Sequence, residues 1–342
     1  SADVTWEVNG VAIDRSYVDV GVGRYFSCAV SGAGTLECWG DTASTYDYGQ
    51  VVDAPTDGHY VAVDGSYYNA CAITTTGELD CWGIETGDIA DGDYGQVTGA
   101  PKGSGYVDVK MRYFTGCALS GSGEITCWGD NGYGQADAPT GDGFSDITVG
   151  HNHACAITSA GAVTCWGISD SSNSDKGQVS DTPTGTGYID VSAGNRHTCA
   201  LDSSGAVECW GVQDGSTYDK DQVTGAPTDS GYVALSSGNY HVCAIDSVGE
   251  LLCWGDNDTE ESTPPNQTGF TTSDADLHHN CALDSDGAID CWGLSNGGTT
   301  DYGQVTDIPN AFVLPSQYFE PGDTVTCSVS ANDGISSGPA SS

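Results

Sequence analysis

A pair of cysteines recurs seven times in this sequence with the same spacing and the same neighbours. In residues 197–211, HTCALDSSGAVECWG, the second Cys follows the first by ten positions and is followed directly by Trp-Gly. The step from one first Cys to the next is 38 to 46 residues. A period of that length is typical of repeat architectures such as the four-stranded blades of a β-propeller. The repeat therefore limits the fold more than any other feature of the chain.

The spacing within each pair predicts a disulfide-bridged β-hairpin. Residues 199–201 and 207–210 form its two strands, residues 203–205 form the turn, and Cys199 faces Cys209. Opposed positions in an antiparallel ladder lie close enough for a disulfide, and each short bridged loop contributes about 2–3 kcal/mol. Zinc binding is the competing interpretation, but zinc sites usually use closer pairs such as C-x2-C, and seven separate pairs would lack further ligands. The predicted disulfides are Cys28–Cys38, Cys71–Cys81, Cys117–Cys127, Cys155–Cys165, Cys199–Cys209, Cys243–Cys253 and Cys281–Cys291.

Two further segments complete each repeat. A short apolar strand precedes the hairpin, and a loop after Trp-Gly leads to a Gly-Gln segment, interpreted as a fourth strand, and then to a Pro. The chain is rich in Gly and lacks long helical periodicity, so we predict an all-β protein. Seven units close well into a ring, which protects the sheet edges. The predicted fold is a seven-bladed β-propeller over residues 16–309 with a bridged hairpin in each blade.

The repeat also resembles a known family. The pattern G-x-x-H-x-C-A-[IL], followed by C-W-G-x-N-x-x-G-Q, is similar to the regulator of chromosome condensation repeat in the Cys-paired form common in bacterial exported proteins, and residues 127–135, CWGDNGYGQ, fit it best. This resemblance implies a seven-bladed propeller. A bacterial β-lactamase inhibitor protein shares that propeller, which makes protein binding across one face a precedent. The sequence departs from the pattern at Asp221, which replaces the Gly before Gln222, and at residues 264–267, PPNQ, which replace the Gly-Gln approach in the sixth repeat.

The charge of the chain excludes some classes of partner. Forty-eight acidic residues face eight basic ones, for a net charge of -40. A surface this negative repels phosphate, so we expect no nucleic-acid partner, and no apolar run is long enough to insert into a membrane. Patterned cysteines favour an oxidising compartment, so we predict an extracellular or cell-surface location. No signal peptide begins the sequence, and we expect the chain to start after processing.

The repeat carries no recognisable catalytic chemistry. His153, His197, His241 and His279 each lie two residues before the first Cys of a pair, so the symmetry of the ring spreads them apart, and we expect structural roles for them. No nucleophile elbow, zinc-protease motif or phosphate-binding loop occurs, so we expect no enzyme and no cofactor. Acidic loops can bind Ca2+, and the nearest candidates are Asp256, Asp258 and Glu260. Asn257 and Asn266 begin glycosylation sequons.

Two features outside the repeat are candidates for binding. Arg24-Tyr25 and Arg112-Tyr113 place residue types favoured at interface hot spots in two blades, and we predict them on a binding face. The other feature is the pair of chain ends. Residues 1–15 and 310–342 alternate like half-buried strands and resemble fragments of a bacterial immunoglobulin-like repeat, with the propeller inserted between them.

The ends form an incomplete module, because two or three strands cannot make a two-sheet sandwich. Cys327 is the odd cysteine, and the repeats it resembles often bridge it to a strand that this chain lacks. The missing strands could come from a longer protein or from a neighbouring subunit by strand addition. The candidate assembly residues are Val4, Trp6, Val8, Val325, Cys327 and Val329.

These features predict an extracellular structural subunit that joins copies of itself head to tail into filaments through its terminal strands. The alternative is a monomeric or surface-anchored module that binds another extracellular protein, or a glycan, through its loop face.

Overall fold

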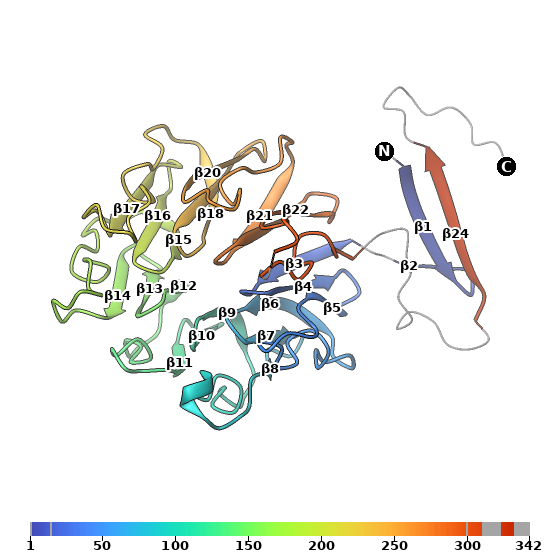
Figure 1. The fold of residues 1–342 in the computed structure, drawn as a ribbon, viewed down its shortest axis with the longest axis horizontal. Coiled ribbons are helices and arrows are strands. Elements are labelled where there is room, and N and C mark those ends of the chain that lie inside the picture. Colours follow the sequence, from blue (N-terminus) through green and yellow to red (C-terminus); the bar gives the residue numbers. More distant parts are fainter. Residues whose placement is uncertain (1, 14–15, 299, 310–322, 332–342) are drawn as a thin grey trace.

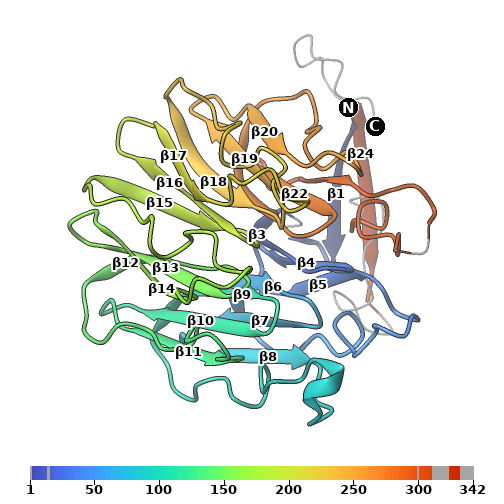
Figure 2. The same cartoon turned by 60° about the vertical axis from the view of Figure 1, so that its left-hand side comes forward.

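The computed structural model describes residues 2–13, 16–298, 300–309 and 323–331. Within them, seven three-stranded antiparallel sheets follow one another around a ring, and an eighth three-stranded sheet combines the two ends of the chain (Figures 1 and 2). Apart from one 3-10 turn, η1 (Ile89–Asp91), the regular structure of the described residues is β. The predicted seven-bladed propeller is therefore confirmed.

Each blade is built from three consecutive strands, the first of which lies nearest the ring axis. Blades 1 to 7 comprise β3 (Tyr17–Val22), β4 (Phe26–Ser31) and β5 (Leu36–Gly40); β6 (Tyr60–Gly65), β7 (Asn69–Thr74) and β8 (Leu79–Gly83); β9 (Tyr106–Arg112), β10 (Thr115–Ser120) and β11 (Ile125–Gly129); β12 (Phe144–Val149), β13 (His153–Thr158) and β14 (Val163–Gly167); β15 (Tyr188–Ala193), β16 (His197–Asp202) and β17 (Val207–Gly211); β18 (Tyr232–Ser237), β19 (His241–Asp246) and β20 (Leu251–Gly255); β21 (Phe270–Ala275), β22 (His279–Asp284) and β23 (Ile289–Gly293).

The second and third strands of every blade form the predicted bridged hairpin. In blade 5, Cys199 lies opposite Cys209 and Leu201 opposite Val207. All seven predicted disulfides are present, and their Cα atoms are 4.0 to 4.1 Å apart. The first Cys of each pair is fully buried and the second is half-buried. Seven internal disulfides indicate an extracellular or secreted protein.

The predicted fourth strand is wrong, because the Gly-Gln segment forms a turn. The Gln50 side chain folds back on its own loop: its Oε1 accepts a hydrogen bond from the Tyr48 N–H (2.6 Å), and its Nε2 donates to the Tyr46 carbonyl (2.8 Å). This leaves the Gln50 backbone carbonyl pointing at the next blade, where the indole N–H of Trp82 donates to it (2.8 Å). The Gln50 side chain therefore stabilises its own turn, and the Gln50 carbonyl anchors the next blade instead of pairing with a neighbouring strand.

The same indole contact joins every pair of neighbouring blades. Each Trp of the Cys-Trp-Gly motif donates from Nε1 to a backbone carbonyl of the preceding blade at 2.7 to 3.0 Å. Between blades 7 and 1 the contact runs from Trp39 to Gln304, residues 265 apart in sequence, and thereby closes the ring. The hydrophobic core is divided in the same way, into clusters that each combine the disulfide of one blade with the Trp of the next.

Blade 6 makes its turn with different residues from those predicted. Glu261, not Gln267, occupies the anchor position, since Trp292 donates to the Glu261 carbonyl (2.9 Å). Glu260 stands where most other blades have a Gly, and its φ is +67°. Asp221, the other replacement, has a φ of +63°. The glycines at this position have φ between +81 and +88°: Gly49, Gly95, Gly134, Gly177 and Gly303. The pattern requires a left-handed residue here, and Glu260 accepts that conformation at a cost.

The eighth sheet joins the ends of the chain directly. β1 (Ala2–Val8) pairs with β2 (Val11–Ile13) on one side and with β24 (Val325–Ala331) on the other, all antiparallel. Asn9 and Gly10 have φ of +54 and +79°, as expected for an Asn-Gly turn between β1 and β2. Asn9 also binds across the ends, donating from Nδ2 to Asp323 (2.8 Å) and accepting from the Thr324 N–H (3.0 Å). The predicted partial immunoglobulin-like module is therefore a single sheet.

Replacing Glu260 by Gly should raise the free energy of unfolding by about 0.5–1 kcal/mol, because Gly adopts a φ of +67° without steric cost and the side chain is exposed. Urea denaturation measures this change. Glu260→Ala keeps a Cβ and should give no gain, so equal stabilisation by Ala and Gly would contradict the role assigned to the backbone.

Candidate functional site at the ring axis and the loop face

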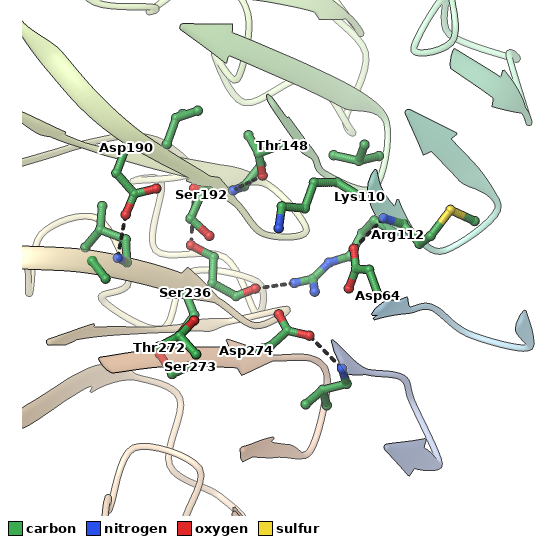
Figure 3. Close-up of a pocket in the computed structure, with 18 of the residues that line it drawn as sticks. Asp64, Lys110, Arg112, Thr148, Asp190, Ser192, Ser236, Thr272, Ser273 and Asp274 are labelled. Carbon is green, nitrogen blue, oxygen red and sulfur yellow. Dashed lines mark hydrogen bonds between the residues drawn. The ribbon is translucent and has the colours of Figure 1, made fainter. Parts of the chain in front are cut away.

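The first strands of all seven blades line a polar channel of about 210 Å3 along the ring axis. Figure 3 shows Asp64, Lys110 and Asp274 projecting into this space from three different strands. Ser and Thr side chains from the other blades, such as Thr148, Ser192 and Ser236, complete the lining. The channel is therefore rich in carboxylates and hydroxyls, with a single ammonium group among them.

Carboxylates of the first strands, four of which line the channel, hold neighbouring blades together. The first strand of a blade is a sheet edge, so some of its N–H groups lack a ladder partner. An Asp of the preceding blade accepts a hydrogen bond from such an N–H at five interfaces: Asp19 from Val63 (2.8 Å), Asp64 from Met111 (2.6 Å), Asp146 from Val191 (3.0 Å), Asp190 from Leu235 (2.7 Å) and Asp274 from Val22 (2.6 Å). These acids act structurally, as clamps between strands.

Burial changes the protonation of these acids. Desolvation raises the pKa of Asp19 to about 7 and that of Asp190 to about 6, although backbone hydrogen bonds and Lys110 act in the opposite direction. The Lys110 ammonium lies 3.5 Å from Asp108, and nearby carboxylates, Asp108 first, hold its pKa well above the usual range. Its side chain keeps 45% of its surface accessible, but this surface faces the channel and not bulk solvent.

One end of the channel is closed by residues of blade 3. The Arg112 guanidinium reaches across the axis and donates to the carbonyls of Ser237 (2.6 Å) and Ala275 (2.8 Å), in blades 6 and 7. It also lies 3.6 Å from the buried Asp276 carboxylate. Burial raises the pKa of Asp276 to about 6, and Arg112 opposes that shift. The phenol oxygen of Tyr113 accepts hydrogen bonds from Asn195 (3.0 Å) and Asn239 (2.8 Å).

The structure brings the four predicted binding residues to this closed end but buries three of them. Tyr25, Arg112 and Tyr113 expose 1, 7 and 8% of their surface, and only Arg24 is half-buried. They are therefore not an exposed binding face, contrary to the prediction. The guanidinium and phenol are used to join blades across the axis, and no sequence pattern indicates this because the contacts are more than eighty residues apart.

The four repeated histidines lie apart, one in each of four blades, and all are fully buried. Three bind a polar side chain of the next blade through Nε2: His153 binds Thr198 (2.8 Å), His241 binds Asn280 (2.6 Å) and His279 binds Ser27 (2.8 Å). Burial lowers the pKa of His153 and His279 to about 3 and that of His241 to about 4, so all three are neutral near pH 7. These geometries are those of structural histidines.

His197 differs from the other three. The equivalent residue of the next blade is Val242, which is fully buried and offers no polar atom. Both ring nitrogens of His197 are buried and have no hydrogen-bond partner within the part of the chain that the structure describes. Desolvation holds the pKa of His197 well below its usual value. Blade 5 therefore carries a buried polar group that the ring does not satisfy, at a cost in stability.

The candidate Ca2+ ligands are arranged around a protein cation. The Lys220 ammonium lies 3.1 Å from both Asp256 and Asp258, while Glu260 takes the left-handed position of its turn. In the part of the chain that the structure describes, no group of three or more His, Cys, Asp or Glu side chains is placed to hold a metal ion. The Asn257 sequon amide donates to Thr263 (3.1 Å) within its own loop, and Asn266 is exposed.

The loop face is the end of the ring that carries the loops between first and second strands and the loops after Trp-Gly. Over blades 1 to 3 it carries a cluster of aromatic rings in mutual contact, with Tyr25 buried and Tyr46 and Tyr94 exposed. We call this cluster the tyrosine face: Tyr25, Tyr46, Tyr48, Tyr67, Tyr68, Tyr94 and Phe114. Tyr302 extends it at one side and Tyr113 with His151 at the other. In the sequence, Tyr46 and Tyr48 of loop 41–48 and Tyr94 of loop 84–94 belong to this cluster, together with Tyr25 of the Arg-Tyr pair.

The six candidate assembly residues face one another in the terminal sheet. Val4 lies opposite Val329, Trp6 opposite Cys327, and Val8 opposite Val325, so the six positions share one face of the sheet. Val325 and Cys327 are exposed, and Cys327 is a free thiol. The side chains of Val4, Trp6 and Val329 lie outside the described residues.

Comparisons with known proteins agree with the repeat. The family model "Regulator of chromosome condensation (RCC1) repeat" matches residues 109–135, 144–178, 188–215 and 232–259. No curated protein matches the chain. No helix in the described ranges is long and apolar enough to cross a membrane.

Solved structures with a similar fold include proteins from plants and yeast. The CRINKLY WD40 ectodomain of the Arabidopsis thaliana receptor kinase ACR4 is 19% identical with a TM-score of 0.62, over 83% of this chain and 99% of that one. The entire ectodomain of the Physcomitrella patens receptor kinase CR4 is 20% identical with a TM-score of 0.62, over 85% and 74%. Prp20p from Saccharomyces cerevisiae, described with its binding to Gsp1p and histones, is 15% identical with a TM-score of 0.55, over 82% and 83%. At these identities the likeness concerns the fold.

Replacing Val242 by Thr should give His197 the partner that Thr198 gives His153, and should raise the free energy of unfolding by about 1 kcal/mol. Urea denaturation checks this. In a His197→Phe background, which copies Phe26 of blade 1, the same substitution should give no gain; a gain that persists there would show that the introduced hydroxyl acts elsewhere.

Asp19 should make the protein less stable as the pH rises. With a folded-state pKa of about 7, its carboxyl keeps a proton that the unfolded chain loses above about pH 4. The stability this provides is complete below about pH 4 and is lost as the pH rises through 7. The free energy of unfolding of Asp19→Asn should therefore rise relative to that of the wild type between pH 4 and 8, by at most about 1.4 kcal/mol per pH unit. A difference between the two urea curves that does not change with pH would contradict this.

Proposed function

We propose that the chain, which is an RCC1-type repeat propeller, is an extracellular, cell-surface structural subunit that joins copies of itself head to tail into filaments through its terminal sheet. The observation that carries the proposal is the sheet β2-β1-β24, whose outer edges have no partner strand among the described residues and which has a row of mostly apolar positions on one face. The ring would then be a rigid bead, and the terminal sheet the joint between beads.

The terminal sheet is incomplete as an immunoglobulin-like domain. Three strands are few for a free-standing sheet, and an immunoglobulin-like sandwich requires a second sheet over the first. The face that such a sheet would cover carries Val8, Val325 and Cys327, and Val325 keeps 38% of its surface exposed. Covering this face and the neighbouring edges with strands of another copy would bury apolar surface, which favours association.

The strand directions favour a head-to-tail contact between copies, which can repeat along a filament. β2 and β24 both run antiparallel to β1, so they run parallel to each other at opposite edges of the sheet. A second copy related by translation would bring its β2 edge beside the β24 edge of the first, and the same contact could then repeat. Pairing of β24 with another β24 would instead be self-complementary and would stop at a dimer.

The full chain should therefore form high-mass species that persist on dilution, and deleting residues 1–12 or 316–342 should leave single propellers, because the joint is lost while the bridged ring remains. Mass photometry and negative-stain electron microscopy measure both. Polymers of the truncated protein would rule out assembly through the terminal sheet, and a species no larger than a dimer would rule out the head-to-tail contact.

Cys327 provides a milder test of the same joint, because every other cysteine of the chain is in a disulfide. A fluorescein maleimide on Cys327 should block assembly by covering the face it shares with Val325, whereas a methylthio group should not. Equal assembly of both labelled proteins would contradict a role for this face.

A further inference from the structure

The tyrosine face is a feature that the ring does not need for its own closure. The same loop positions in blades 4 to 7 carry mostly polar residues, among them Asn152, Asn195 and Asn239, and these blades close with the same indole contacts. Aromatic residues at these positions are concentrated in blades 1 to 3. Blades 4 to 7 therefore close without such a cluster of rings. This difference between the two sets of blades points to a role for the rings other than blade packing.

The outer rings of the face are open to solvent. Tyr46 and Tyr94 expose 40 and 37% of their surface, and Ile89 of η1, in the same loop as Tyr94, exposes 67%. Both outer rings rest on inner ones: Tyr46 stacks on Tyr25 with centroids 5.2 Å apart, and Tyr94 on Phe114 at 5.1 Å. Rings held in place by such stacking lose little side-chain freedom when a partner binds.

The loops around these rings are acidic. Loops 41–48 and 84–94 contain six Asp or Glu residues and no Lys or Arg. Asp88 and Asp91 are exposed. Burial raises the pKa of the Tyr48 phenol, and the Asp91 carboxylate raises it further, so the charge of Asp91 acts on the rings. Aromatic faces carry a negative quadrupole, so rings and carboxylates together attract a cation.

Contacts between an Arg guanidinium and a Tyr ring already occur within this chain. The Arg24 guanidinium lies over the rings of Tyr25 (4.7 Å) and Tyr67 (4.3 Å) within the tyrosine face. On the same end of the ring, the Arg196 guanidinium lies over Tyr218 (3.7 Å). Two of the chain's eight basic residues are thus held by tyrosines of the loop face, whereas Tyr46 and Tyr94 have no such partner among the described residues.

We propose that the tyrosine face binds an arginine-bearing, positively charged segment of another extracellular protein, whose guanidinium groups lie on the rings of Tyr46 and Tyr94. A second copy of this chain has few guanidinium groups to offer, because the sequence contains four Arg and three of them, Arg24, Arg112 and Arg196, already contact rings or carbonyls of their own propeller. Arg suits the site better than Lys, because its planar group stacks on aromatic rings. The proposal concerns the loop face alone and is independent of assembly through the terminal sheet.

The test is fluorescence anisotropy with two labelled peptides of equal charge, nona-arginine and nona-lysine, added to the full-length protein at 50 and 150 mM salt. Nona-arginine should bind several-fold more tightly at both concentrations. Replacing Tyr46 and Tyr94 together by Ala should weaken its binding roughly five- to thirtyfold, as expected for two cation–π contacts, without changing the net charge. Replacing both by Phe should preserve binding, because the rings remain.

Tyr133→Ala is the matched control. Tyr133 is similarly exposed, at 42%, and makes no ring contact within the described residues. Its loss should leave the affinity unchanged, and thermal unfolding of each variant confirms that the ring is intact. Equal affinity of the two peptides, indifference to the double Ala substitution, or equal weakening by Tyr133→Ala would each overturn the proposal and leave only non-specific attraction to an acidic protein. Binding to neutral oligosaccharides that competes with nona-arginine would assign the face to glycans instead, which also overturns it.

Discussion

The hydrogen bond from each Trp indole to a carbonyl of the preceding blade is the contact on which the ring depends. It fixes the position of one blade on the next, and the same Trp packs on the neighbour's disulfide, so a polar and an apolar constraint act together. A three-stranded blade has little core of its own, and most of the buried apolar surface lies between blades. Stability is therefore a property of neighbouring pairs, as in other repeat proteins, and closure through Trp39 and Gln304 supplies the last pair.

Local geometry is predictable from the sequence, and long-range geometry is not. The Cys spacing determines the hairpin register of every blade, because ten positions and a short turn allow few other pairings. The Gly-Gln segment resembles a strand in sequence because its short apolar pattern does not reveal that Gln50 satisfies its own turn. The sequence does not mark Glu261 as the anchor of blade 6 either. Its position supplies only a backbone carbonyl to the next blade, and any residue can provide one.

In the candidate site, too, local features can be predicted from the sequence and long-range contacts cannot. The residue types at the axis stand out in the sequence, but their burial does not, since Arg112 meets Ser237 and Ala275 only after the ring has closed. Likewise, the structural role of the histidines follows from their repetition, whereas the missing partner of His197 depends on Val242 of the next blade. Pairing of β1 with β24 joins residues more than three hundred positions apart, and only the resemblance of the two ends to one domain indicates it.

Arg112 has a consequence for how such a ring could arise or be built. A closed ring of seven blades has seven equivalent positions around its axis but room for one guanidinium, and here a single blade fills it while others place Gly150, Gly194 and Gly238 at the matching position. A propeller made from seven identical copies of blade 3 would direct seven positive charges at one point. Duplication of an ancestral blade could therefore give this molecule only if the copies diverged at the axis, and a designer using one consensus blade would have to leave that centre empty or give one copy a different sequence.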